Sequence, residues 1–463
     1  MSVQDRTVST PIEPETLARL RNESETNPLS LLARNAVTET DIDKVSLNRE
    51  RVLAINPEVE TKLDQLGVTN QKSSGRCWMF AALNVHRHRI AKELNLKDFE
   101  FSESYLQFFD KLEKANYSLR AFSQRLSELD ADTTDIQAFD DRVIDHVLRY
   151  NAGDGGFYHF FTNLVAKYGI VPKYAFDETE SSSSTRKMSQ AIESQLRKVA
   201  WQIVASDRQA EAVEKLIEQG LEGVYRILAA HLGQPPTSFV WQYRNKDDEF
   251  TRVGEMTPQQ FTETYLPNLD DFVVLQHDPR PSMQQNQLYQ LQYCNNVWGT
   301  QDYTYLNTSL EELRAAAKAS LDQGTPVWFA CDVDQQFSRQ LGLWDPKMFQ
   351  REEVYGIDLG LSRAERLLSR DSVPTHAMSL TGYDAVEAGD GTTSINWRVE
   401  NSWGTKDSDG KTEFRGEGFG TMTDSWFDTF LFQVVVPRAC VPEHLLPGLD
   451  TQPIQLPVYD LMA

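Results

Sequence analysis

Strand-forming segments are concentrated in the last third of the chain, and the segments before them are mostly helical in pattern. From Gly324 onwards, short runs that are apolar or alternating and bounded by turn formers predict strands: TPVWFACDV, HAMSLTGYDAV, INWRVENSW and FLFQVVV. Residues 186–233 are rich in strong helix formers. Because helices and strands are separated along the chain, we expect an α+β fold whose β part is antiparallel.

Shifts in composition divide the chain into five segments. The four serines of 181–184 mark one boundary, and Gly324 marks another. Pro453 and Pro457 exclude a helix at the end of the chain. The predicted segments are an N-terminal arm (1–60), a helical lobe (61–180), an inserted mainly helical module (181–323), a β lobe (324–437) and an extended C-terminal arm (438–463).

The composition limits the classes of partner. Hydrophobic residues make up 40% of the chain and charged residues 25%, which is usual for a soluble globular protein. Neither a secretion signal nor an apolar run long enough for a membrane span is expected, so we predict a cytoplasmic protein. The formal net charge of −22 repels phosphate backbones, and nucleic acid is therefore an unlikely partner, although a local basic groove stays open.

The four cysteines, Cys77, Cys294, Cys331 and Cys440, lie far apart and form no CxxC pair. Such spacing argues against both a zinc site and a disulfide framework. We expect reduced thiols, no bound metal and no cofactor.

Cys77 has the setting of a reactive thiol. It follows the loop LDQLGVTNQKSSGR and opens a predicted helix over 77–94. Unpaired backbone N–H groups and the helix dipole at that position favour the thiolate, so we expect the pKa of Cys77 to be lowered. Amide cleavage through a thiolate also needs a base, a group that orients the base, and donors for the oxyanion.

Three motifs resemble those of papain-family cysteine peptidases. QKSSGRCW, which contains Cys77, resembles the segment around the nucleophile of that family. HAMSLTGY, which begins at His376, resembles the strand that carries its base, and NSWG, which begins at Asn401, resembles its asparagine motif. The order Cys, His, Asn is also that of the family.

The resemblance implies a papain-like two-lobed catalytic domain, with a helical lobe and an antiparallel, barrel-like β lobe. Cys77 is then the nucleophile, His376 the base and Asn401 the residue that orients the base. The side chain of Gln71 and the backbone N–H of Cys77 form the oxyanion hole. Taken singly, His376 is also compatible with a strand histidine and Asn401 with a turn residue.

The glycine cluster at 153–156 is similar to the glycine clamp of the same family, and YGIVPKYAF is similar to the segment that follows it. Gly156 would then present backbone groups to the main chain of the substrate, although a simple turn glycine is the other interpretation. Secreted members have a disulfide between this cluster and the position occupied here by Ser74. Neither place holds a cysteine in this chain, which suits a reducing compartment.

A large helical insert, the missing disulfide and an extended Pro-containing C-terminus resemble the bleomycin hydrolase and aminopeptidase C group. That resemblance implies a cytosolic cysteine aminopeptidase acting on peptides, assembled as a homohexamer with the C-terminal arm in each cleft. The carboxylate of Ala463 would pair with the ammonium group of the substrate and exclude longer chains.

Other interpretations stay open. An endopeptidase or an acyltransferase could use the same triad, and a nucleic-acid-binding protein could carry peptidase activity as a secondary property. The insert could serve assembly or cover the cleft. His86-Arg-His88-Arg is expected to form a solvated basic face rather than a metal site, because positions two apart on a helix point in different directions.

Overall fold

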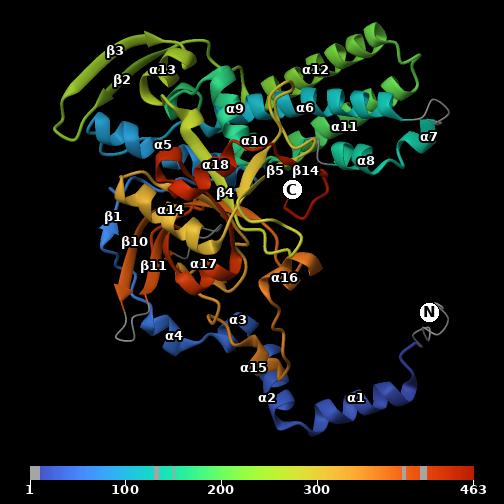
Figure 1. Cartoon of the computed structure of the whole chain (residues 1–463), viewed down its shortest axis with the longest axis vertical. Coiled ribbons are helices and arrows are strands. Elements are labelled where there is room, and N and C mark those ends of the chain that lie inside the picture. Colours follow the sequence, from blue (N-terminus) through green and yellow to red (C-terminus); the bar gives the residue numbers. More distant parts are fainter. Residues whose placement is uncertain (1–10, 130–134, 150–151, 388–392, 407–413, 463) are drawn as a thin grey trace.

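A helical region, a large mixed sheet and a set of N-terminal helices follow one another along the long axis of the molecule (Figure 1). The computed structural model describes residues 11–129, 135–149, 152–387, 393–406 and 414–462. Within these ranges, no helix is both long enough and apolar enough to cross a membrane.

The sheet contains 12 described strands and joins parts of the chain that are distant in sequence. Its order is β14-β5-β6-β4-β13-β7-β10-β11-β12-β9-β8, with β1 also paired to β10. Most pairs are antiparallel, whereas β12–β9, β4–β6 and β14–β5 are parallel. The strands are β1 (Thr61–Lys62), β4 (Phe272–Gln276), β5 (Gln287–Leu291), β6 (Thr304–Asn307), β7 (Val327–Cys331), β8 (Phe337–Ser338), β9 (Leu343–Trp344), β10 (His376–Glu387), β11 (Thr393–Glu400), β12 (Phe419–Thr423), β13 (Leu431–Pro437) and β14 (Ile454–Leu456).

The helical region packs around α6, because its side chains are buried along most of its length. The side chain of Ser102 accepts the N–H of Tyr105 and caps the start of this helix. Helices α11 and α12 pack against α6 through an apolar cluster that includes Leu119, Leu196 and Leu228. The longer helices here are α5 (Cys77–Glu93), α6 (Glu103–Glu128), α8 (Arg142–Arg149), α9 (Tyr158–Tyr168), α11 (Arg186–Val204) and α12 (Ala210–Leu232).

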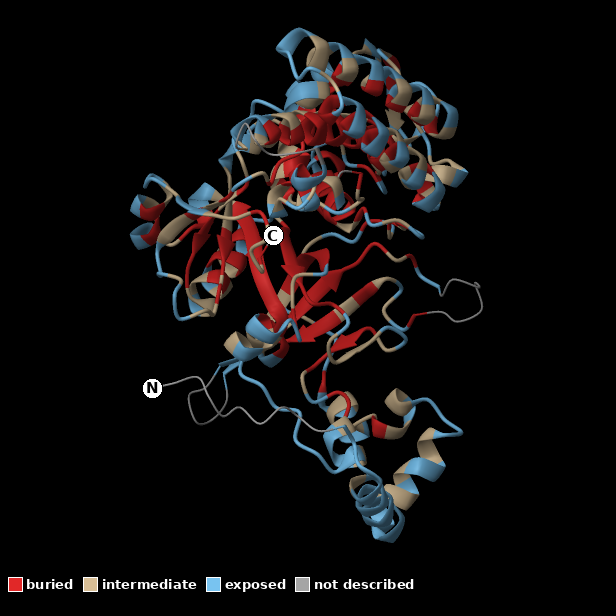
Figure 2. Cartoon of the chain, turned by 90° about the vertical axis from the view of Figure 1, so that its right-hand side faces the viewer, coloured by how far each residue is buried: buried red, intermediate tan, exposed pale blue. Residues whose placement is uncertain are grey.

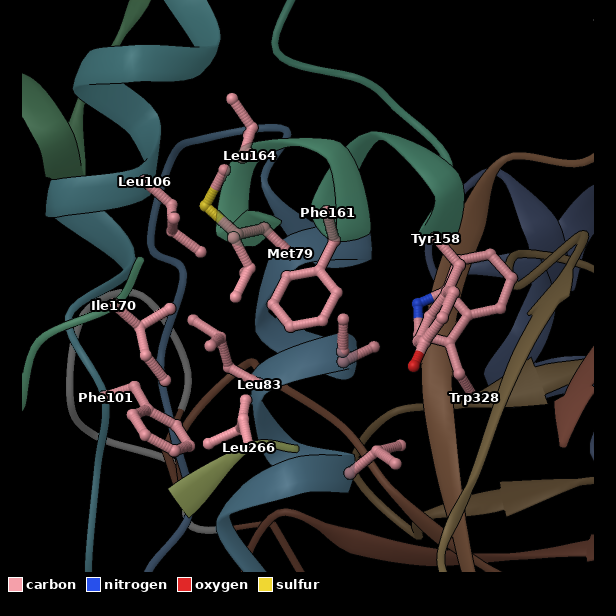
Figure 3. Close-up of a cluster of buried hydrophobic side chains, with 14 of the residues drawn as sticks. Met79, Leu83, Phe101, Leu106, Tyr158, Phe161, Leu164, Ile170, Leu266 and Trp328 are labelled. Atoms are coloured by element: carbon pink, nitrogen blue, oxygen red, sulfur yellow. The ribbon is translucent and has the colours of Figure 1, made fainter. Parts of the chain in front are cut away.

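Helix α5 is the element that connects the helical region to the sheet. Met79 and Leu83 of α5 belong to a buried cluster with Phe161 and Leu164 of α9 and Trp328 of β7 (Figure 3). Buried side chains follow all faces of this helix, which is typical of a helix in the centre of a core. Its first residue is Cys77.

The N-terminal arm consists of α1 (Pro14–Thr26), α2 (Pro28–Val37), α3 (Ile42–Ser46) and α4 (Arg49–Ala54). No side chain of α1 or α2 is buried, and these helices project from the sheet (Figure 2). Elsewhere in the described chain, the helices are α14 (Leu310–Asp322) and the shorter α7 (Asp135–Ala138), η1 (Lys173–Ala175), α10 (Glu180–Ser183), η2 (Leu269–Asp271), α15 (Arg351–Tyr355), α16 (Arg363–Ser369) and α17 (Asp424–Phe430).

The segment 181–323, expected to be mainly helical, needs correction over 239–307. Helices α11 and α12 are followed by the hairpin of β2 (Phe239–Arg244) and β3 (Phe250–Met256), then by α13 (Pro258–Tyr265) and three strands of the large sheet. Strand β4 pairs with β13, which comes from the far end of the chain. This pairing buries apolar residues of both strands and connects the segment to the large sheet.

The C-terminal segment 438–463 was expected to be extended throughout, and that expectation is wrong for its first half. Helical turns η3 (Arg438–Cys440), η4 (Glu443–Leu445) and α18 (Leu446–Leu449) come before β14. Pro447 lies in the first turn of α18, where the missing N–H of proline has no helical partner to lose.

Candidate active site

The loop before α5 runs alongside the segment that contains Asn401. The backbone N–H of Gln71 donates to the carbonyl of Ser402 over 2.8 Å, and the N–H of Gly404 donates to the carbonyl of Thr69 over 3.0 Å. These bonds connect two segments that are far apart in sequence. They bring two of the three predicted motifs into direct contact.

The start of α5 lies against the start of β10. Cys77 is the first residue of the helix, and His376 is the first residue of the strand. The hydroxyl of Ser379 in β10 donates to the carbonyl of Ala81 in α5 over 3.1 Å. The thiol of Cys77 also receives a backbone hydrogen bond from Ala377. The sulfur therefore lies beside the residue that directly follows His376.

Asn401 holds the imidazole of His376 through one of its two ring nitrogens. Nε2 of His376 lies 2.9 Å from Oδ1 of Asn401, and the same oxygen accepts the backbone N–H of Ser402 over 2.8 Å. Because this oxygen can only accept, Nε2 carries the ring hydrogen and Nδ1 carries the lone pair. The ring of Trp403 covers the imidazole at a centroid distance of 4.7 Å, which shields the hydrogen bond from water.

Burial disfavours the charged form of both reactive side chains. It lowers the pKa of His376 to about 4, although the hydrogen bond to Asn401 acts in the opposite direction. Burial likewise raises the pKa of the Cys77 thiol, and backbone hydrogen bonds from Ala377 and Trp78 only partly offset this. The sequence predicts that the helix N-terminus and a neighbouring imidazolium lower the pKa of Cys77, whereas burial acts in the opposite direction and is the largest single contribution in the structure.

The amide of Gln71 has a fixed orientation next to Cys77. Its Nε2 donates to the carbonyl of Ser74 over 2.7 Å, and its Oε1 accepts the hydroxyl of Ser402 over 2.7 Å. An amide NH₂ group has two hydrogens, so the bond to Ser74 leaves the second one for an oxyanion. Ser402 connects this amide to Asn401, which in turn binds His376.

Gly156 approaches the nucleophile helix more closely than any other residue type could. A Cβ atom at this position would lie 2.7 Å from Cε2 of Trp78. The indole N–H of Trp78 donates to the carbonyl of Asp154 over 2.7 Å, which fixes the loop against the helix. The glycine loop therefore lies against the residue that follows Cys77.

Ala463 lies outside the described residues, but the segment before it is anchored. The guanidinium of Arg280 binds both carboxylate oxygens of Asp460 over 2.8 Å. Met462 is buried against Leu367 and Phe432. Phe432 lies in β13, directly after Leu431, which is in register with Cys331 of β7 and, across it, with His376 of β10.

The histidines and the first arginine of the His86-Arg-His88-Arg run are buried, so the prediction of a solvated face is wrong. Arg87 forms an ion pair with Glu400, and His88 lies 3.3 Å from the same carboxylate. Helix α5 is surrounded by core on all sides, so these side chains need buried partners. Sequence reasoning missed Glu400, although an acidic residue directly before Asn401 at the end of an apolar strand was a usable signal.

A thiol at a helix N-terminus, beside a histidine that an asparagine orients, defines a papain-like thiol peptidase. The chain belongs to the Peptidase C1-like family, whose sequence profile matches residues 11–463.

Similarity to individual proteins extends over nearly the whole chain. Bleomycin hydrolase of Homo sapiens is 35% identical and covers 98% of this chain and 99% of its own length. Aminopeptidase C of Lactobacillus delbrueckii subsp. lactis is 33% identical, with 94% of each protein covered. The crystal structure of pepw from Lactobacillus rhamnosis hn001 superposes with a TM-score of 0.90 at 34% identity, covering 98% of this chain and 99% of that one. Together, the family and these relatives identify a cysteine-type aminopeptidase.

Proposed function

We propose that this chain removes N-terminal residues from peptides through a thioester on Cys77, with His376 as acid and base and Asn401 as the residue that orients the imidazole. One observation carries the assignment. Nε2 of His376 forms the hydrogen bond with Asn401, so the lone pair of the other ring nitrogen, Nδ1, is available to the proton on the sulfur of Cys77.

The chemical steps follow from these positions. The Cys77 proton moves to Nδ1 of His376, and the thiolate attacks the scissile carbonyl carbon. The negative charge on the carbonyl oxygen is stabilised by Nε2 of Gln71 and the N–H of Cys77. The tetrahedral adduct collapses, the C–N bond breaks, and His376 gives its proton to the leaving amine. Water then gives a proton to His376, attacks the thioester and releases the carboxylic acid and the thiol.

The C-terminal tail supplies the preference for free N-termini in this proposal. Its support is the anchoring of the residues just before Ala463, through the ion pair of Asp460 with Arg280 and the burial of Met462. That carboxylate pairs with the ammonium group of the substrate, and the tail excludes residues beyond it. We further propose that the protein acts in the cytoplasm as a homohexamer.

Replacement of the nucleophile tests the assignment. Cys77→Ala should abolish hydrolysis of aminoacyl fluorogenic substrates, because no other group in the proposal can form the thioester. The control is Cys440→Ala, a thiol remote from the triad in the sheet-side core, which should keep activity within about threefold. Substantial turnover by Cys77→Ala would contradict the proposal.

A second experiment tests the tail. Removal of Ala463, and separately the addition of one glycine after it, both displace the terminal carboxylate. We expect both variants to raise cleavage of N-acetyl peptides relative to free ones, measured as the ratio of the two kcat/KM values. An unchanged ratio in both would favour an endopeptidase, and transfer to an added amine would favour an acyltransferase.

A further inference from the structure

Two buried lysines of α6 hold the backbone of the glycine loop. Nζ of Lys114 donates to the carbonyls of Gly153 and Gly155, over 3.1 and 2.7 Å. Nζ of Lys111, one turn earlier, binds the carbonyl of Ala152. Because a lysine is rarely buried without strong partners, these contacts mark a loop whose shape is tightly specified.

Asp154 connects this loop to the segment that contains the nucleophile. One carboxylate oxygen pairs with Nζ of Lys111 over 2.5 Å, and the other accepts the backbone N–H of Gly75 over 3.0 Å. The hydroxyl of Thr185 also donates to the second oxygen. Since Trp78 donates to the carbonyl of the same aspartate, Asp154 bonds to residues on both sides of Cys77.

The contact between the two segments leaves no space for a side chain at Gly75. A Cβ atom on Gly75 would lie 2.8 Å from Cβ of Asp154, which is closer than side chains normally approach. On the other side of the loop, a Cβ atom on Gly156 would lie similarly close to the ring of Trp78. Asp154 therefore lies in close contact with Gly75, and the loop that it belongs to lies in close contact with Trp78.

The charges around Asp154 are buried and balanced. Burial by itself would raise the pKa of Asp154, but Lys111 and the Gly75 N–H outweigh it and hold the pKa below its ordinary value. Burial lowers the pKa of Lys111, and Asp154 opposes that change. Lys114 is balanced by Asp110 at 2.7 Å. The negative charge of Asp154 also acts on Cys77 and opposes its thiolate.

We propose that Asp154, held by Lys111, is a positioning residue for hydrolysis: it fixes the substrate-binding glycine loop relative to the nucleophile and sets the electrostatic environment of the Cys77 sulfur. The proposal rests on the proposed function of Cys77 and on the role in substrate binding that the sequence predicts for Gly156. Asp154 binds the Gly75 N–H and the Trp78 indole N–H, and it acts on the sulfur only through its charge, without contact.

Two single substitutions give opposite electrostatic signatures. Asp154→Ala removes the carboxylate and leaves Lys111 charged. The limb of the kcat/KM pH profile that reports the ionisation of Cys77, called the Cys77 limb below, should then move to lower pH. Lys111→Met leaves Asp154 uncompensated, and the same limb should move to higher pH. In both variants we expect KM for an unblocked peptide to rise about tenfold with a smaller change in kcat, because the glycine loop is displaced.

A conservative double variant provides the rescue. Asp154→Asn with Lys111→Met removes both charges and retains an acceptor for Gly75, so KM should return to within about threefold of the wild-type value. The control is Glu113→Gln. Glu113 also lies on α6, but it pairs with Lys167 and does not contact the glycine loop. This control should leave KM and the pH limbs unchanged even where its melting temperature falls.

The proposal would be overturned if the control changed KM and the Cys77 limb as much as Asp154→Ala does. It would also be overturned if Asp154→Ala and Lys111→Met moved the Cys77 limb in the same direction. If Asp154→Ala does not fold, Lys111→Met and the double variant still decide the outcome. Failure of the positioning role leaves Cys77→Ala inactive, whereas failure of the proposed function leaves Cys77→Ala active, so the two results are distinguishable.

Discussion

At Cys77 and His376, the loss of solvent disfavours a charge on either side chain alone. Burial raises the pKa of the thiol and lowers that of the imidazole to about 4, so for each group taken alone it favours the neutral form. Proton transfer between them creates two opposite charges at once, and each stabilises the other. The reactive ion pair is therefore a property of the two residues together.

The pH profile of kcat/KM should follow from these shifts. Activity should fall on the acid side near pH 4, where His376 of the free enzyme becomes protonated and no longer accepts the Cys77 proton. In the native protein, the hydrogen bond to Asn401 raises the pKa of His376. Asn401→Ala removes this bond and lowers that pKa, so the acid limb should move to lower pH. Measurement between pH 3 and 10 with an aminoacyl substrate checks both limbs, and an acid limb unmoved in Asn401→Ala would contradict this account.

Part of the site could be predicted from sequence because its residues lie in short motifs. Cys77, Gln71 and Asn401 each have flanking residues that identify them, and the structure brings them together with His376. The position of Asp154 in a glycine cluster was visible, but its partner Lys111 lies on a helix without a motif. A contact between such residues depends on how elements pack, which local patterns do not encode.

At the scale of elements, one buried ion pair links α5 to the end of β11. Arg87 and Glu400 are both almost fully inaccessible, and Arg87 also donates to the carbonyl of Gly67 over 2.6 Å. Glu400 directly precedes Asn401, so the pair fixes the strand end that supplies the orienting asparagine. The nucleophile and the asparagine are thus tied to a common support.

Breaking this pair should be costly. Glu400→Gln leaves the guanidinium of Arg87 buried without a countercharge, and we expect a loss of about 3–5 kcal/mol in the free energy of unfolding. The double variant Arg87→Met with Glu400→Leu should lose clearly less than the single one, because no uncompensated charge remains. Urea unfolding measures both, and Glu214→Gln, which breaks a partly exposed pair with Arg120, should cost about 1 kcal/mol or less. A double variant less stable than Glu400→Gln would contradict this account.

The strands after Gly324 could be predicted because their apolar and alternating runs are bounded by turn formers, and the structure places β7, β10, β11 and β13 there. Strands β5 and β6 could not, since QLYQL and TYLN are short and carry polar residues. Their stability comes from pairing with each other, with the neighbouring β4 and with β14, which is distant in sequence. Fold class was therefore easier to infer than the division into segments.

At the scale of the whole molecule, the N-terminal arm exposes apolar side chains that one chain does not cover. Leu17 and Leu20 of α1 and Leu29 and Leu32 of α2 are all exposed. Exposed apolar patches of this kind usually mark an interface. They support the proposal that the arm contacts a second copy of the chain in a homohexamer.

Deletion of the arm tests this assembly. Removal of residues 1–38 should reduce the mass measured by light scattering from that of a hexamer to that of a smaller species, because the leucine-bearing helices are lost. Leu17→Ser with Leu29→Ser should have the same effect in a milder form, whereas Trp201→Ser, an exposed apolar residue on α11, should not. A hexameric mass in the deletion variant would contradict the role of the arm.

The pairing of β4 with β13 has a consequence for protein engineering. Excision of 181–323 would remove β4, one of the two strands that pair with β13. This would expose a row of unpaired amide and carbonyl groups along Val434, Val435 and Val436. The shortened polypeptide would then present an open apolar edge and aggregate, instead of yielding a minimal enzyme.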